Sequence, residues 1–528
     1  MSGIQAVDLL AIGPPLLVAL AAIVLLVADL FVADLRGTAG RWALPGANLA
    51  ALGGALALVA WQGWSTGAPR RTFCLPGGLP GGSGGGGAGG AGGAGGAGGA
   101  ACSYVADDLA LVLQAAMLLG TAVVVLLAVH AVDETRLPAG EFHFLVLASL
   151  SGALTLAAAG DLLTLVVALE VVSLPAYGLV ALRRYDGRST EAALKFFLVS
   201  VVSAAVTLYG ISLVYGVTGA VHFAAVREAL SDPGARMPIT ALGVGLTVAG
   251  FAFKVAAVPF HFWAPDTYVG APLPVTAYLS VVSKAAGFVG LLLVLVEAFR
   301  PYADVWGPLV AVLAAATMTV GNLVALRQTQ AVRLLAWSSV AQAGYMLAPL
   351  GAAAAATGRD ESLGDAVGAT VVYLLIYVAM NLGAFAVVSV VGRERPRNLL
   401  EDYRGLARRA PLPALGLVFF LACLAGLPPG LSGLFAKVAI FRATVEGEVG
   451  WLAVVVAVNT VIGLYYYLAW AVTLFAPSLQ AAPGPPRLGR PPMGLTAALA
   501  VTAVASIALS VSPELVFQVV PGIAAGVP

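Results

Sequence analysis

Fourteen long apolar runs occupy most of this chain. Each has about the 20 residues that an α-helix needs to cross the hydrocarbon layer of a bilayer. Hydrophobic residues make up 60% of the 528 residues and charged residues only 10%, unlike a water-soluble domain. The sequence therefore predicts an all-α polytopic membrane protein, with spans near 10–32, 43–62, 108–130, 142–160, 162–182, 192–216, 239–260, 274–298, 306–326, 334–352, 366–391, 412–441, 450–475 and 494–516.

Several other classes of protein are excluded by what the chain lacks. Its three cysteines form no CxxC pair and have no spacing typical of an iron–sulfur cluster or structural zinc. No glycine-rich nucleotide-binding motif is present, and no basic run interleaved with aromatic residues indicates nucleic-acid binding. We therefore expect no metal or cofactor in this chain. No basic residue precedes the first apolar run, so we interpret it as a retained helix rather than a cleaved signal peptide.

Positive charge is divided between two residue types. All four lysines, Lys195, Lys254, Lys284 and Lys437, fall inside apolar runs, whereas the 23 arginines lie in or beside the predicted loops. Arginine stays charged at any workable pH, but a desolvated lysine can lose its proton. Because a charge inside a bilayer is expensive, each lysine is a candidate functional residue.

The arginines also indicate an orientation. If loops alternate between the two sides of the membrane, sixteen arginines fall on one side, including a cluster at 393–409, and seven on the other. Cytoplasmic loops carry the excess of basic residues. We therefore expect both termini to lie outside the cell.

Two spans contain helix-breaking residues. The seventh is interrupted at Pro259, and the twelfth contains Pro428 and Pro429 among several glycines. A proline removes a helical hydrogen bond, so the freed polar groups must face protein or water rather than lipid. Either break alone is explained equally well by an ordinary kinked helix.

The two breaks lie five spans apart, which indicates a repeat. Consecutive repeats of five helices must lie inverted in the bilayer, as in many transporter cores. We predict two inverted five-helix repeats, spans 4–8 and 9–13, each with a broken helix. The predicted units are three N-terminal helices at 1–130, a first repeat at 142–298, a second repeat at 306–475 and a C-terminal helix and tail at 494–528.

A glycine-rich insert at 77–100 falls in the outer loop between the second and third spans. Such a composition is typical of a flexible linker. Cys74 and Cys102 flank it on the side where disulfides persist. Both a disulfide and two unrelated thiols fit this spacing, and we favour unrelated thiols.

One carboxylate falls near the middle of a span. Glu170 lies in the fifth span, and nothing nearby in the sequence can solvate it, so it should pair with a cation from another helix. Lys254, beside the first break, is the expected partner, although a side chain near a helix end can also snorkel to the interface. Lys284 and Lys437 have apolar residues on both sides. For Lys195, an interfacial ion pair with Glu191 is an equally good explanation.

A row of lysines with a glutamate at one end can pass protons. Desolvation favours neutral lysine and a nearby carboxylate favours the charged form, so movement of the carboxylate would switch the lysine between holding and releasing its proton. Serines, Tyr278, Tyr345, Gln342 and enclosed water could connect the sites. His261 titrates near neutral pH and could join them, but a structural hydrogen-bonding role fits it equally well.

The segment that surrounds these residues resembles a known family. Phe253-Lys254, then Pro259-Phe-His-Phe-Trp-Ala-Pro-Asp-Thr-Tyr-Val-Gly-Ala-Pro-Leu-Pro-Val275 and Ser283-Lys284, are similar to the antiporter-like membrane subunits of respiratory NADH:quinone oxidoreductase (complex I). The Tyr-x-Gly-Ala-Pro ending and a lysine at 437, where M-type subunits usually have glutamate, are most similar to N-type subunits. The resemblance covers nearly the whole chain.

This resemblance implies a proton-translocating subunit in a bacterial cell membrane. In the family, a glutamate of the fifth span pairs with a lysine of the seventh, a lysine of the eighth bridges the halves, and a residue of the twelfth controls the exit. These roles fall on Glu170, Lys254, Lys284 and Lys437, with Lys195 as an additional candidate. NADH, FMN, iron–sulfur clusters and quinone are expected in partner subunits of complex I, and the insert at 77–100 has no counterpart that we associate with the family.

Three alternatives remain open at the level of the sequence. A subunit of a multisubunit sodium/proton antiporter shares the Pro-Phe-His-x-Trp-x-Pro-Asp core, and membrane subunits of energy-converting hydrogenases are a further possibility. A structural membrane anchor is the third. Four lysines inside apolar runs weigh against a passive anchor, because such charges destabilise a span.

Overall fold

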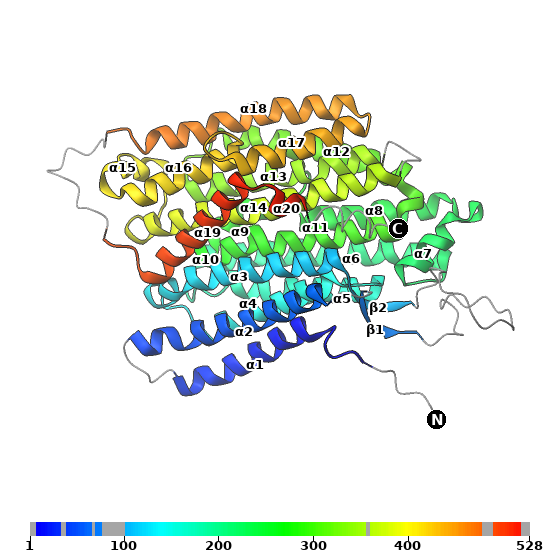
Figure 1. Cartoon of the computed structure of the whole chain (residues 1–528), viewed down its shortest axis with the longest axis horizontal. Helices are drawn as coiled ribbons and strands as arrows, with labels where there is room; N and C mark the ends of the chain where they lie inside the picture. Colours follow the sequence, from blue (N-terminus) through cyan, green and yellow to red (C-terminus); the bar gives the residue numbers. More distant parts are fainter. Residues whose placement is uncertain are drawn as a thin grey trace.

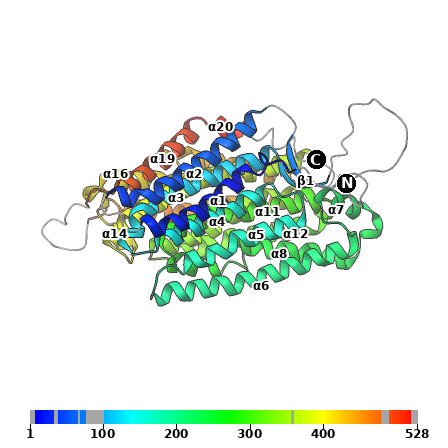
Figure 2. The same cartoon turned by 90° about the horizontal axis from the view of Figure 1, so that it is seen from below.

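The computed structural model describes residues 7–32, 38–65, 69–75, 101–354, 360–477 and 489–518. Its helices run side by side along the long axis of the molecule, as Figures 1 and 2 show from two directions. The predicted all-α membrane fold is confirmed. The glycine-rich insert at 77–100 lies outside the described residues.

The first part of the chain forms α1 (Gly13–Val32), α2 (Thr38–Trp64), α3 (Asp108–Glu134), α4 (Ala139–Ala157), α5 (Leu162–Val180), α6 (Gly187–Thr218), α7 (Phe223–Ser231), α8 (Pro238–Lys254), α9 (Trp263–Gly270), α10 (Leu273–Tyr278) and α11 (Lys284–Leu292). Short 3₁₀ helices lie at η1 (Pro233–Ala235) and η4 (Arg300–Tyr302). The π-helical segments η2 (Leu279–Ser283) and η3 (Leu293–Ala298) flank α11 and were not predicted.

The second part of the chain forms α12 (Ala303–Ala325), α13 (Ala331–Ala353), α14 (Asp360–Glu394), η5 (Leu400–Tyr403), α15 (Leu406–Arg409), α16 (Pro411–Ala425), α17 (Leu431–Glu446), α18 (Gly450–Thr473), α19 (Met493–Val511) and α20 (Glu514–Phe517). In the part of the chain that the structure describes, eleven helices are long and apolar enough to cross a membrane, and α8 and α16 are shorter apolar helices. Every predicted span falls on a helix or on a broken pair, while the count of fourteen spans stays a prediction.

Both predicted breaks are present. Helix α8 ends at Lys254 and α9 begins at Trp263, and α16 ends at Ala425 and α17 begins at Leu431. Each break contains one cis proline peptide bond, at Pro259 and at Pro429. Gly426 takes a left-handed conformation with φ +79° directly after α16, as expected for a residue that terminates a helix.

A small β-hairpin stands at one end of the helix bundle. Strands β1 (Arg70–Cys74) and β2 (Cys102–Ala106) pair antiparallel with Cys74 opposite Cys102, and a disulfide joins the two cysteines. Our interpretation of these residues as unrelated thiols was therefore wrong, because strand pairing brings them together across the insert. The hairpin was also not predicted.

The hairpin is fastened to the helices around it. Val105 N donates to Ala158 O at 2.8 Å, and Gly160 N donates to Ser103 O at 2.9 Å, which ties β2 to the turn before α5. Asp8, just before α1, donates its backbone N–H to Thr72 Oγ1 at 3.0 Å. We call this end of the bundle the hairpin end. Helices α14 and α15 finish at the opposite end, which we call the arginine end because it carries the arginines of 393–409 (Figure 1).

Removal of the disulfide should destabilise the hairpin end. A cross-link between residues 28 apart removes loop-closure entropy from the unfolded chain, worth about 3.6 kcal/mol in the chain-entropy model. We expect Cys74→Ser with Cys102→Ser to lower the thermal unfolding temperature in detergent, and reductant to lower that of the unaltered protein only. Equal unfolding temperatures for the variant and the unaltered protein without reductant would contradict a stabilising cross-link.

Candidate functional site

Lys254 is held by neutral groups from two other helices. Its ammonium donates to Ser173 Oγ of α5 at 2.6 Å and to Ser200 Oγ of α6 at 3.0 Å. The hydroxyl of Tyr177 also donates to Ser200 Oγ, at 2.5 Å. On the other side, Gly287 of α11 lets the backbone of Lys254 approach closely, since a Cβ there would lie 3.2 Å from the Lys254 Cβ atom.

Glu170 lies beside this cluster rather than in an ion pair. Glu170, Ser173 and Tyr177 are spaced i, i+3 and i+7, so they share one face of α5. Among the described residues no carboxylate lies within 4 Å of the Lys254 ammonium, although the charge of Glu170 acts on it electrostatically. One oxygen of Glu170 is buried without a hydrogen-bond partner in the described residues. The expected direct pair is thus replaced by an arrangement in which Ser173 lies one turn from the carboxylate.

Lys284 is buried near the centre of the bundle. It is 3% exposed, and its ammonium donates to the backbone oxygen of Ser339 in α13 at 2.6 Å. The hydroxyl of Tyr377 donates to Ser339 Oγ at 2.9 Å. The ammonium of Lys284 is therefore met by the backbone carbonyl of Ser339, a residue whose hydroxyl is itself hydrogen-bonded to Tyr377.

Lys437 lies against the broken end of α16. It is 8% exposed, and its ammonium donates to Ala425 O, the last residue of that helix, at 2.7 Å. The ammonium is also 5.5 Å from the centroid of the Tyr345 ring, within cation–π range. Carbonyls at a helix C-terminus carry a partial negative charge, so a cation is stabilised at this position.

A buried polar network on α13 lies between Lys284 and Lys437. The Tyr467 hydroxyl pairs with Ser338 Oγ at 2.5 Å, and Gln342 Nε2 donates to the Tyr467 hydroxyl at 3.1 Å. The Tyr373 hydroxyl donates to Gln342 Oε1, and its ring stacks on Tyr345. Gln342 and Tyr345 of α13 were predicted from the sequence, but the tyrosines of α14 and α18 were not, because their helices are far from α13 in the chain.

Lys195 lies in a different setting. Its side chain is 47% exposed, and it forms ion pairs with Glu191 at 2.7 Å and Asp266 at 3.1 Å. Arg333 approaches Asp266 at 3.4 Å. The ion pair with Glu191 that the sequence offered as an explanation is present, and a second carboxylate is added to it.

The two remaining candidates occupy separate positions. His261 lies in the break between α8 and α9, where its ring packs against Trp337 with centroids 5.2 Å apart. Tyr278 is fully buried near Ser149, and its hydroxyl has no hydrogen-bond partner among the described residues. Neither contacts a lysine through a hydrogen bond found in the described part of the chain.

Pro259, Pro428 and Pro429 mark where the lysine-bearing helices break. All three are exposed on the surface of the isolated chain. Within the described residues no group of three or more histidine, cysteine, aspartate or glutamate side chains could hold a metal ion. The polar groups gathered around these lysines are hydroxyls and backbone carbonyls.

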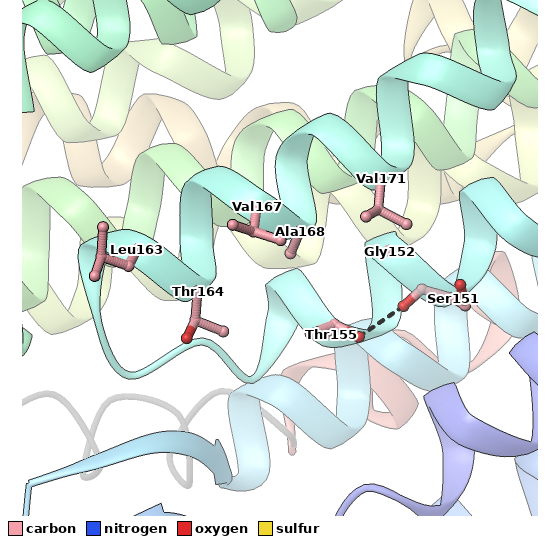
Figure 3. Close-up of a pocket in the computed structure, with 8 residues that line it drawn as sticks. All are labelled: Ser151, Gly152, Thr155, Leu163, Thr164, Val167, Ala168 and Val171. Atoms are coloured by element: carbon pink, nitrogen blue, oxygen red, sulfur yellow. Dashed lines mark hydrogen bonds between the residues drawn. The ribbon is translucent and has the colours of Figure 1, made fainter.

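A groove on the outer wall of the bundle lies apart from these charges. It has a volume of about 320 Å³ and is lined by residues of α4 and α5, namely Ser151, Gly152, Thr155, Leu163, Thr164, Val167, Ala168 and Val171 (Figure 3). Its hydroxyls are bonded within the protein, as shown by Thr155 Oγ1, which donates to Ser151 O. Glu170 does not line it.

Two broken helices with Lys254 and Lys437 beside the breaks are the architecture of an antiporter-like membrane protein, and comparison with known proteins agrees. The family model for NADH:quinone oxidoreductase/Mrp antiporter transmembrane proteins matches residues 159–463. NADH-quinone oxidoreductase subunit N 2 of Streptomyces griseus is 53% identical, over 98% of this chain and 94% of that protein. Subunit N of Salinispora tropica is 46% identical, over 90% of this chain and 87% of that protein. The chain belongs to the NADH-quinone oxidoreductase subunit N family.

Solved structures give the same result for the fold. A chain in respiratory complex I from Thermus thermophilus with bound aureothin is 32% identical, with a TM-score of 0.72 over 96% of this chain and 98% of that chain. A chain of the Mrp complex from Dietzia sp. DQ12-45-1b has a TM-score of 0.77 over 98% of this chain and 97% of that chain. Its sequence is 22% identical, so this likeness shows the fold alone. The resemblance found in the sequence is confirmed.

Neutralising Lys195 should have little effect on proton movement. Its charge is exposed and already paired with two carboxylates, and exposed pairs contribute little. We expect Lys195→Gln to leave NADH-driven proton uptake by inverted membrane vesicles within about twofold of the unaltered protein. A loss as large as that caused by Lys254→Met would place Lys195 in the relay.

Proposed function

We propose that this chain is the membrane subunit of a proton-translocating NADH:quinone oxidoreductase that carries protons through Glu170, Lys254, Lys284 and Lys437. NADH oxidation with FMN and iron–sulfur clusters, and quinone reduction, would occur in partner subunits of the complex. One observation carries the proposal. In the part of the chain that the structure describes, the ammonium groups of Lys254, Lys284 and Lys437 donate hydrogen bonds only to hydroxyls and carbonyls, whereas exposed Lys195 has two carboxylate partners.

The physical reason is the cost of an unpaired buried charge. An ammonium beside a carboxylate is stabilised in its charged form. An ammonium that only neutral groups solvate gives up less favourable interaction energy when it releases its proton. Hydroxyl groups can serve both states, because they accept from an ammonium and donate to an amine. Such lysines can alternate between the two forms within one fold.

The distribution of the lysines supports a relay with two halves. Lys254 ends the half-helix α8, Lys437 contacts the end of the half-helix α16, and Lys284 lies between them in the chain. Inverted repeats at 142–298 and 306–475 would produce such an arrangement, with one lysine at the broken helix of each repeat. The helices of 1–130 and the C-terminal part at 494–528 would complete the subunit.

We further infer that the hairpin end faces the outside of a bacterial cell membrane, with both termini on that side. The Cys74–Cys102 disulfide lies there, and disulfides persist in oxidising compartments. The arginine-rich segment 393–409 lies at the other end, as the positive-inside bias requires.

Neutralising Lys254 or Glu170 should impair proton pumping without preventing assembly of the complex. We expect Lys254→Met or Glu170→Gln to lower NADH-driven proton uptake by inverted vesicles about tenfold, a loss near 1.4 kcal/mol in barrier terms. Quinone reduction is followed in the same vesicles, and a native gel checks that the complex is intact. Unchanged pumping per NADH in an assembled complex would refute the relay.

The orientation is tested with single cysteines at the two ends of the bundle. Ser65 at the hairpin end and Glu401 at the arginine end are both exposed in the isolated chain. We expect an impermeant maleimide to label Ser65→Cys in intact spheroplasts and Glu401→Cys only in inverted vesicles. The unaltered protein supplies the background, and the reverse pattern would invert the topology.

An antiporter subunit without NADH chemistry is the second candidate, because the chain of the Mrp complex shares the fold. Purification of the tagged chain in mild detergent separates the two. Flavin and iron–sulfur absorbance in the purified material supports the oxidoreductase. An assembly without either chromophore supports the antiporter.

A further inference from the structure

Gln342 is a buried amide that contacts the surroundings of two lysines. It lies on α13 and is 1% exposed. Its Nε2 donates to Leu424 O at 3.5 Å and to the Tyr467 hydroxyl at 3.1 Å, and its Oε1 accepts from the Tyr373 hydroxyl. Because a backbone carbonyl can only accept, the amide nitrogen must face Leu424 and the oxygen must face Tyr373.

On one side, Gln342 reaches Lys437 by two routes. Leu424 and Ala425 are the last two residues of α16, and Lys437 donates to Ala425 O at 2.7 Å. Gln342 and Lys437 therefore hold neighbouring carbonyls of one broken helix end. The second route passes through Tyr373, whose ring stacks on Tyr345 at 6.3 Å, and the Tyr345 ring in turn faces the Lys437 ammonium.

On the other side, Gln342 reaches the support of Lys284. The Tyr467 hydroxyl, to which Gln342 donates, pairs with Ser338 Oγ at 2.5 Å. Ser339, the next residue, provides the carbonyl that accepts from Lys284 at 2.6 Å. One side chain thus connects the groups that solvate both lysines.

An amide cannot pass a proton at neutral pH, because it neither gives up nor takes one readily. It can, however, fix the direction in which neighbouring hydroxyls donate. A charged Lys437 makes a charge-assisted hydrogen bond to Ala425 O, roughly twice as strong as the bond from a neutral amine. Loss of that proton therefore loosens the end of α16, where Gln342 is the other donor.

We propose that Gln342 is a positioning residue that couples the protonation of Lys437 to the orientation of the Tyr467 and Tyr373 hydroxyls, and so to the surroundings of Lys284. This inference rests on the relay proposed above. It differs from the sequence-based hypothesis for Gln342, in which the residue was a connecting member of the proton path.

A double-mutant cycle in the assembled complex tests the coupling. Proton uptake per NADH is measured in inverted vesicles for Gln342→Leu, Lys437→Met and the double variant. We expect Gln342→Leu alone to lower the ratio about fivefold, equivalent to about 1 kcal/mol. Because the effect passes through Lys437, the double variant should match Lys437→Met within about twofold, whereas independent structural losses would multiply.

Gln114 provides a matched control. It is a fully buried amide on α3 that donates to the Tyr104 hydroxyl at 3.1 Å and to Leu154 O at 2.8 Å. Gln114→Leu removes the same kinds of hydrogen bond away from the lysines, so we expect lower thermal stability with an unchanged ratio of protons to NADH. An equal fall in that ratio for Gln114→Leu would overturn the inference, because general destabilisation would then explain the effect of Gln342→Leu.

The remaining outcomes are separable. Normal pumping in Lys437→Met refutes the relay itself. Impaired pumping in Lys437→Met with multiplicative losses, or with no effect of Gln342→Leu, refutes only the role of Gln342. If Gln342→Leu does not assemble, Gln342→Glu takes its place, since it keeps an acceptor for Tyr373 and removes the donor to Leu424. The same non-multiplicative pattern is then expected.

Discussion

Lipid offers no hydrogen-bond partner to a backbone carbonyl, and this constraint shapes both broken helices. At the first break, Ala257 N donates to Ala252 O and the indole of Trp263 donates to Phe253 O, so the end of α8 is closed by its own chain. At the second break, the last carbonyls of α16 receive hydrogen bonds from Gln342 and Lys437. In the proposed relay, Lys437 would carry protons and also closes this helix end, so fold and function would meet at one place.

Charge compensation separates the lysines into two kinds. Lys195 is exposed and lies between carboxylates, an arrangement that holds its charge at little cost. Lys254, Lys284 and Lys437 have serine hydroxyls or carbonyls instead, and Glu170 acts on Lys254 from beyond direct contact. A carboxylate held at this separation can bias the proton of Lys254 without fixing it in place, which is what a switch requires.

Much of the fold follows from the sequence because a bilayer permits few solutions. Apolar runs of the right length must be helices, and Pro259 and Pro428–Pro429 indicate the breaks correctly. The hairpin of Arg70–Cys74 and Cys102–Ala106 could not be predicted in this way, because its two short strands flank a low-complexity insert. The disulfide becomes evident only once the two strands pair. The charged residues inside the apolar runs could likewise be read directly from the sequence. Their neighbours were not, since Ser200, Ser339 and Tyr467 become partners only when helices distant in sequence pack together.

We propose that Lys254 can release its proton because no carboxylate holds it directly. Ser173→Asp tests this, since Ser173 Oγ lies 2.6 Å from the Lys254 ammonium and a carboxylate there would form an ion pair. Proton uptake per NADH is measured in inverted vesicles beside Ser173→Asn, the neutral variant of similar size. We predict that Ser173→Asp assembles but pumps poorly, whereas Ser173→Asn retains most of the activity. Equal pumping by Ser173→Asp and the unaltered protein would contradict it.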